Sequence, residues 1–204
     1  MRLVKDAKIA YINPPRTGTV QVHRWLKQAT GCDVVIPSPL FSGHHTVYSP
    51  RYRDYYWFMS VRHPYTRCIS IWRRLIEKSP KGRPPKWKSI LSQYRSFSDL
   101  VLCDLPFVRH YWDAMICSVF VGSVPVVHSV IQQETLLDDF NKLPFVNSRI
   151  KEAGKVNVSE DKSAWHEHYT PAALERIQRV FARDFEQYGY TLDFDAVVEG
   201  NYLV

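Results

Sequence analysis

The chain has 204 residues, of which 45% are hydrophobic and 23% are charged, and its formal net charge is +7. These values are close to globular averages and exclude a disordered chain. The length predicts a single domain, residues 1–204, with a sizeable core. The excess of positive charge favours an acidic partner. Charge alone leaves nucleic acid, an anionic membrane surface, a sulfated or phosphorylated ligand and a nucleotide cofactor open.

The four cysteines, Cys32, Cys68, Cys103 and Cys117, form no C-x-x-C pair and have no regular spacing. A chain of this size does not need disulfides for stability, so we expect reduced thiols, as in a cytoplasmic protein. We expect no membrane anchor, because no apolar run approaches the roughly 20 residues of a spanning helix. The N-terminal residues lack the pattern of a signal peptide, which also predicts a cytoplasmic location.

Apolar periodicity predicts strands that alternate with helices. Apolar runs at residues 8–13, 32–36 and 55–61 are predicted strands, and the last is apolar enough for a central strand buried on both faces. One-sided apolar stripes predict helices after the first and the third of these runs. The later predicted elements are helices over 98–105 and 108–120, a strand over 124–131, and helices over 136–143 and 171–188. The alternation indicates an α/β fold with a mostly parallel sheet.

The last predicted helix has the clearest ends. Thr170 is a typical N-cap, Pro171 is suited to the first helical position, and Gly189 follows the end. These signals predict one continuous helix between Thr170 and Gly189.

The segment between the first strand and the first helix has the pattern of a binding site. Residues 14–20 read Pro-Pro-Arg-Thr-Gly-Thr-Val. A strand, a glycine-containing turn and a helix start direct backbone N–H groups and the positive end of a helix dipole toward one point, where a phosphate can bind. The Walker A pattern G-x-x-x-x-G-K-[ST] is absent from this loop.

A second candidate anion site follows the long apolar strand, since ligands of open α/β sheets bind outside the carboxyl ends of the strands. Arg62 ends this strand, and Ser70 lies eight residues later, about two turns into the next predicted helix. The guanidinium and the hydroxyl could bracket another phosphate. A nucleoside with phosphates at both ends would need such a layout. We interpret His63 as a structural residue that fixes the turn at Pro64.

Two segments together resemble the cofactor motifs of the sulfotransferase superfamily. They are Pro15-Arg16-Thr17-Gly18-Thr19 and Val61-Arg62-His63-Pro64-Tyr65-Thr66-Arg67-Cys68-Ile69-Ser70. In that family a P-K/R-[ST]-G-T-[ST] loop holds the 5′-phosphosulfate of 3′-phosphoadenosine-5′-phosphosulfate (PAPS). A V-R-[NDH]-P-x-x-R-x-x-S segment binds its 3′-phosphate through the Arg and the Ser. The stretch from His168 to Tyr190 also resembles the last helix of carbohydrate-type and bacterial members.

The resemblance implies a P-loop-like three-layer fold with a central, mostly parallel sheet flanked by helices. It implies PAPS as the cofactor, 3′-phosphoadenosine-5′-phosphate (PAP) as its product, and no required metal. The residues that it assigns to cofactor binding are Arg16, Thr17, Gly18, Thr19, Val20, Arg62 and Ser70. Two positions depart from the family's usual pattern. Arg16 replaces a lysine, keeping the charge but not the ability to donate a proton, and Val20 lacks the usual hydroxyl.

The implied reaction is in-line transfer of the sulfuryl group to a hydroxyl, or less readily an amine, of a small-molecule or carbohydrate acceptor. Positioning and electrostatics supply most of the rate, with Arg16 stabilising the leaving phosphate. A base must also remove the acceptor proton. His44 and His45 lie in Gly43-His44-His45-Thr46, where related sulfotransferases have a catalytic histidine. The Gly-His match favours His44, and a shift of one residue would select His45.

Two other functions stay open from the sequence. A nucleotide kinase of the P-loop class would also hold phosphate, although the Walker lysine is missing and no Mg²⁺ carboxylate is evident. A basic module that binds a polyanion without catalysis would agree with the net charge of +7. If the sulfotransferase resemblance holds, we expect no nucleic-acid partner.

Overall fold

The computed structural model describes residues 1–35, 50–73, 94, 96–103, 115, 120–121, 124–151 and 165–204. The chain divides into two compact units, which are described here one at a time. The first comprises Met1–Arg62 and Met115–Val158, and the second comprises His63–Ala114 and Ser159–Val204. The prediction of a single domain over residues 1–204 stays a prediction.

The first unit is built on a four-stranded sheet with the order β1-β2-β3-β6. β1 (Arg2–Val4) pairs antiparallel with β2 (Ile9–Ile12). β3 (Tyr56–Val61) pairs parallel with both β2 and β6 (Ser129–Gln132). This arrangement confirms the predicted mixed α/β class with a mostly parallel sheet. β4 (Phe120–Val121) and β5 (Val124–Pro125) form a separate antiparallel pair.

The two strands at the centre of the sheet are buried along their length. All residues of β2 are buried, as are residues 57–61 of β3. β3 lies between β2 and β6, so the predicted central position of the long apolar run is confirmed. The parallel register pairs Ile12 with Met59, which brings the carboxyl ends of β2 and β3 to the same edge of the sheet.

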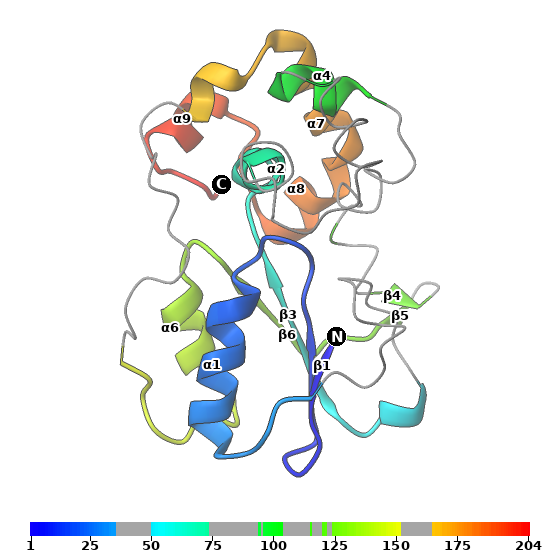
Figure 1. Ribbon diagram of the computed structural model, residues 1–204, viewed down its shortest axis with the longest axis vertical. Helices are drawn as coiled ribbons and strands as arrows, with labels where there is room; N and C mark the ends of the chain where they lie inside the picture. Colours follow the sequence, from blue (N-terminus) through cyan, green and yellow to red (C-terminus); the bar gives the residue numbers. More distant parts are fainter. Residues whose placement is uncertain are drawn as a thin grey trace. The chain divides into compact units, whose positions relative to one another are not determined.

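Helices α1 (Thr19–Thr30) and α6 (Leu136–Asn141) lie against the same face of this sheet (Figure 1). The rings of Trp25 on α1 and Phe140 on α6 are 5.4 Å apart, and Tyr11 of β2 stacks on Phe58 of β3 at 4.8 Å. Burying one such side chain stabilises the fold by roughly 1.5–3 kcal/mol. This core fixes the start of α1 against the end of β2.

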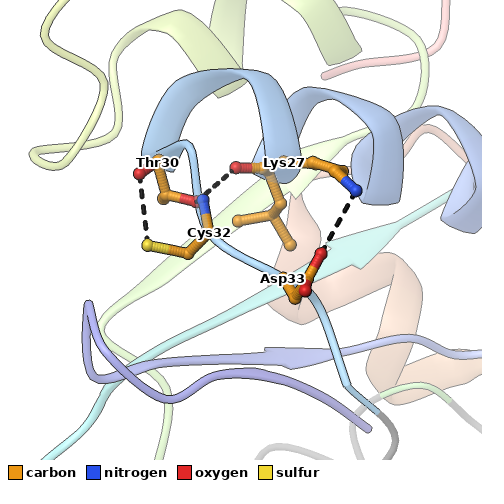
Figure 2. A network of polar contacts seen from close by, with 5 residues as sticks. Lys27, Thr30, Cys32 and Asp33 are labelled. Atoms are coloured by element: carbon orange, nitrogen blue, oxygen red, sulfur yellow. Dashed lines mark hydrogen bonds and ion pairs between the residues drawn. The ribbon is translucent and has the colours of Figure 1, made fainter.

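A network of polar contacts closes the C-terminal end of α1 (Figure 2). Gly31 has φ +66° and donates its N–H to the carbonyl of Lys27. The Thr30 hydroxyl donates to the Leu26 carbonyl and accepts from the Cys32 N–H, while the Cys32 thiol donates to the Thr30 carbonyl at 3.2 Å. Lys27 pairs with Asp33 at 3.1 Å.

The predicted strand over residues 32–36 is wrong for residues 32–35, and Ile36 lies outside the described residues. The chain leaves the helix in a turn, and within the described part of this stretch only Val35 reaches the sheet, through an isolated antiparallel bridge to Leu3. β1, which the sequence did not predict, takes the edge position instead. The single strand predicted over 124–131 is also wrong in its extent. Val124–Pro125 form β5 of the separate pair, and β6 begins only at Ser129.

The described elements of the second unit are all helical. They are α2 (Pro64–Trp72), α4 (Phe97–Leu102), the 3-10 turn η5 (Trp165–His168), α7 (Pro171–Val180), α8 (Ala182–Tyr188) and α9 (Phe194–Val198). A further 3-10 turn, η2 (Pro50–Tyr52), lies in the first unit. α2 and α4 both contact α7. Along the described part of the chain no helix is long and apolar enough to cross a membrane.

The predicted C-terminal helix is confirmed at its ends and wrong in the middle. The Thr170 hydroxyl accepts from the Ala173 N–H at 3.3 Å, and Gly189 ends the segment with φ +66°. Phe181 leaves the helical conformation (φ −106°, ψ 17°), so the segment is two helices. The Phe181 ring at this bend is buried and lies 5.7 Å from the Arg67 guanidinium.

The other predicted helices differ in length. α4 covers the start of the predicted helix 98–105 and is closed by a capping box between Ser96 and Asp99. α6 ends at Asn141, before the predicted end at residue 143. The predicted helix 108–120 lies outside the described residues except at Met115 and Phe120, and Phe120 is in β4.

Candidate anion-binding loop

The loop that connects β2 to α1 has a strained backbone. Arg16 has φ +68° and Gly18 has φ +85°. A residue with a side chain rarely adopts such a conformation, and backbone strain of this kind is concentrated at functional sites. Arg16 is thus held in an unfavourable conformation at the position where the sequence predicts a phosphate contact.

Glycine is favoured at position 18 for two reasons. Its positive φ disfavours any side chain, and a Cβ atom would lie 2.7 Å from Leu136 Cδ2. Gly18 is also the N-cap of α1, where no side chain caps the helix. The first N–H groups of a helix lack intrahelical partners, so those of Thr19 and Val20 are suited to an anion.

The Thr17 side chain points inward, into a chain of hydroxyl groups. Thr17 is fully buried, and its hydroxyl donates to the Pro14 carbonyl at 2.9 Å and lies 2.7 Å from Ser60 Oγ. Ser60 Oγ lies 2.6 Å from the Tyr11 hydroxyl. The Thr17 hydroxyl therefore supports the loop, and its backbone N–H is the group left for a ligand.

Thr19 has a different environment from Thr17. Its Oγ1 is buried and has no hydrogen-bond partner among the described residues. Burial raises the pKa of Tyr11 to about 12, while the nearby hydroxyls of Ser60, Thr19 and Thr17 lower it. The Thr19 hydroxyl therefore lies close enough to the Tyr11 hydroxyl to influence its pKa. A buried hydroxyl without a partner is costly, and a bound phosphate oxygen would satisfy it.

Arg62 connects the second predicted motif to this loop. It follows the last residue of β3, and its guanidinium donates from Nη1 to the Arg16 carbonyl at 3.5 Å. Two cationic residues predicted to bind phosphate are therefore neighbours at the carboxyl ends of adjacent parallel strands. Such a pair concentrates positive potential beside the α1 N-terminus.

The outer side of α1 is also basic. A shallow hollow there is lined by Val20, His23, Arg24, Lys27 and Gln28, and Val20 is 48% exposed. Burial, followed by the charges of Arg2 and Lys27, lowers the pKa of His23, which favours the neutral ring at neutral pH. The positive surface therefore continues from the loop along the helix.

The remaining predicted site residues are not part of this loop. Ser70 belongs to α2 of the second unit and is 9% exposed. His44 and His45, the two predicted bases, lie outside the described residues. No group of three or more potential metal ligands occurs among the residues that the structure describes.

His63 has the structural role that the sequence predicts. It is fully buried, its Nδ1 accepts from the Tyr65 N–H at 3.3 Å, and it caps α2 ahead of Pro64. Since Nδ1 accepts, Nε2 carries the proton and donates to the Thr191 carbonyl at 3.0 Å. The side chain thereby joins the start of α2 to the C-terminal part of the second unit.

Tyr11 and Ser60 are the residues of this region that sequence reasoning missed. Each is a polar group within an otherwise apolar, fully buried strand. Buried polar groups require hydrogen-bond partners, so their presence in such strands was a usable signal. That these two residues are each other's partners could not be predicted, because Tyr11 and Ser60 are 49 residues apart in the sequence.

No family model, curated protein or solved structure gives a significant match to this chain. The assignment of a function therefore depends on the loop geometry and on the sequence motifs.

Proposed function

We propose that this protein is a PAPS-dependent sulfotransferase with a P-loop-like three-layer fold. The observation that carries the proposal is the loop after β2, where Arg16 and Gly18 have positive φ and the Arg62 side chain contacts the Arg16 carbonyl. The order of the two motifs and the eight residues from Arg62 to Ser70 add to it. A nucleotide with phosphates at both ends accounts for both motifs, and ATP does not.

The residues of the loop suit a phosphate group. Gly18 places no side chain over the start of α1, and the Thr19 hydroxyl in the first turn of the helix would donate to a phosphate oxygen. The N–H groups at the start of α1 add further donors and the positive end of the helix dipole. Val20 contributes its N–H despite lacking a hydroxyl. These groups would hold the 5′-phosphosulfate of PAPS.

When bound, PAPS supplies the sulfuryl group that an acceptor oxygen attacks in line. The Arg16 guanidinium would stabilise the charge that grows on the departing phosphate oxygen, together with the loop N–H groups. Arginine cannot protonate that oxygen, so its contribution is electrostatic. His44, or His45 next to it, would take the acceptor proton. Arg62 and Ser70 would bind the 3′-phosphate. The acceptor is a hydroxyl-bearing small molecule or carbohydrate.

Calorimetric titration with PAP tests the proposal. We expect the wild-type chain to bind PAP, and Ser70→Ala to weaken binding about tenfold, because a hydrogen bond to a charged phosphate is lost. Binding of adenosine 5′-phosphosulfate, which lacks the 3′-phosphate, should be unchanged in Ser70→Ala. Ser98→Ala removes a serine hydroxyl elsewhere in the second unit, where it contacts Thr170, and should leave both ligands unaffected.

Failure of the wild-type chain to bind PAP or PAPS would overturn the proposal. Magnesium-dependent turnover of ATP would instead support a nucleotide kinase. Salt-sensitive binding of heparin without any affinity for PAP would support a polyanion-binding module. Transfer of labelled sulfate from PAPS to an acceptor would establish the reaction itself.

A further inference from the structure

The three hydroxyl groups beneath the loop form a chain with a single direction. The Pro14 carbonyl oxygen can only accept a hydrogen bond, so the Thr17 hydroxyl donates its proton to it, with 2.9 Å between the two oxygens. Ser60 must then donate to Thr17 Oγ1 at 2.7 Å, and Tyr11 must donate to Ser60 Oγ at 2.6 Å. The order Tyr11 to Ser60 to Thr17 to Pro14 follows from counting one proton on each hydroxyl.

This chain joins the loop to the two central strands. Tyr11 lies on β2 and Ser60 on β3, whereas Pro14 and Thr17 lie at either side of the turn. Tyr11, Ser60 and Thr17 are each fully buried. The Tyr11 ring stacks on Phe58, which holds its hydroxyl in place. Ser60 is the central link, because it is hydrogen-bonded to both the strand tyrosine and the loop threonine.

A second tyrosine–serine pair lies elsewhere in the same sheet. The Tyr56 hydroxyl is 2.6 Å from Ser129 Oγ, and the pair bridges β3 and β6 at the first residues of both strands. It has the same chemistry and length as the Tyr11–Ser60 pair but lies at the strand ends opposite the loop. Removing the serine hydroxyl of each pair in turn therefore distinguishes an effect on the stability of the sheet from an effect on the conformation of the loop.

We propose that Ser60 is a positioning residue for phosphate binding. It holds Thr17 so that the N–H groups of the strained segment from Arg16 to Thr19 stay directed at the phosphate. Without the Ser60 hydroxyl, Thr17 and Tyr11 each lose a buried partner and the turn relaxes away from its strained form. The inference rests on the proposed function, since it concerns the 5′-phosphate site.

The test compares Ser60→Ala with Ser129→Ala in titrations with PAP, at a temperature where unfolding curves show both variants folded. We expect Ser60→Ala to weaken PAP binding about tenfold or more, because the hydrogen bond that connects Ser60 to the loop at Thr17 is lost. Ser129→Ala should change the affinity less than about twofold. Phosphorus NMR of bound PAP should show a shifted 5′-phosphate resonance in Ser60→Ala and an unchanged 3′-phosphate resonance.

A second pair of variants keeps the test decisive if Ser60→Ala does not fold. Thr17→Val removes the hydroxyl at similar shape and should reproduce the loss, whereas Thr17→Ser keeps the hydroxyl and should restore most of the affinity. If wild-type protein binds PAP and Ser60→Ala or Thr17→Val binds it equally well, the positioning role is wrong and the proposed function stands. If the wild-type chain does not bind PAP, both fail together.

Discussion

Replacing Gly18 with alanine is the most direct perturbation of the candidate loop. A non-glycine residue in the left-handed region costs about 1–2 kcal/mol. The new Cβ would also lie 2.7 Å from Leu136 Cδ2, so the end of this partly buried leucine side chain must shift, at a further cost of about 0.5–1.5 kcal/mol. We therefore expect Gly18→Ala to lower the free energy of unfolding by roughly 1.5–3.5 kcal/mol, and to weaken PAP binding as well.

Gly31→Ala is a matched control for the backbone term. Gly31 has φ +66°, close to the φ of +85° at Gly18, but an added Cβ meets nothing within 4 Å. Gly31→Ala should therefore lower the free energy of unfolding only by the cost of the left-handed backbone conformation, about 1–2 kcal/mol. In a chain of this length each kcal/mol lowers the melting temperature by about 2–4 °C. Urea and thermal unfolding followed by tryptophan fluorescence would measure both variants.

The difference between the two variants tests the contact with Leu136. If Gly18→Ala and Gly31→Ala destabilise equally, the leucine makes no difference and the reasoning is wrong. A double-mutant cycle sharpens this, because Gly18→Ala should cost less in a Leu136→Ala background, with a coupling energy of about 0.5 kcal/mol or more. Additive effects of the two changes would refute the contact.

Two further predictions concern buried side chains. Burial raises the pKa of Tyr11 to about 12 from an ordinary value of 10.0, so the unfolded chain loses this proton first as the pH rises. The stabilisation is complete below pH 10 and declines as the pH rises through 12. In urea unfolding, the wild-type protein should therefore lose about 2 kcal/mol more than Tyr11→Phe between pH 9 and 12, and equal losses would contradict this. His63→Ala should lower the free energy of unfolding by about 3 kcal/mol or more, because it leaves the Tyr65 N–H and the Thr191 carbonyl unsatisfied beside a cavity. Chemical unfolding measures this change, and a loss below about 1 kcal/mol would show that His63 is not the link between these groups.

The strands and helix around the loop were predictable because their signals are local. The run over residues 55–61 is apolar at almost every position, and the stripe that starts at Val22 has the helical period. β1 has three residues and is defined by its hairpin with β2, so no periodicity could reveal it. The break at Phe181 was hidden for the opposite reason, because apolar residues continue at a spacing of four on both sides of it.

The candidate site shows the same division between local and distant information. Arg16 and Gly18 were predictable because a strand, a turn and a helix follow one another directly. The inward direction of the Thr17 hydroxyl was not predictable, since it depends on a contact with Ser60, which is 43 residues away in the sequence. A threonine in a phosphate loop is ordinarily expected to offer its hydroxyl to the ligand. Here the tertiary contact with β3 turns that hydroxyl toward the core, so that of the two threonines only Thr19 would donate its hydroxyl to the proposed phosphate.

The contact between Arg62 and the Arg16 carbonyl changes what an arginine variant would report. If Arg62 binds the 3′-phosphate alone, Arg62→Ala should weaken binding of PAP and leave binding of adenosine 5′-phosphosulfate unaffected, which is the result expected for Ser70→Ala. However, its guanidinium also donates to the loop that would hold the 5′-phosphate, at 3.5 Å. Removing it should therefore weaken both nucleotides, PAP by more because two interactions are lost. An Arg62→Ala variant that affects PAP alone would mean that this contact does not support the loop.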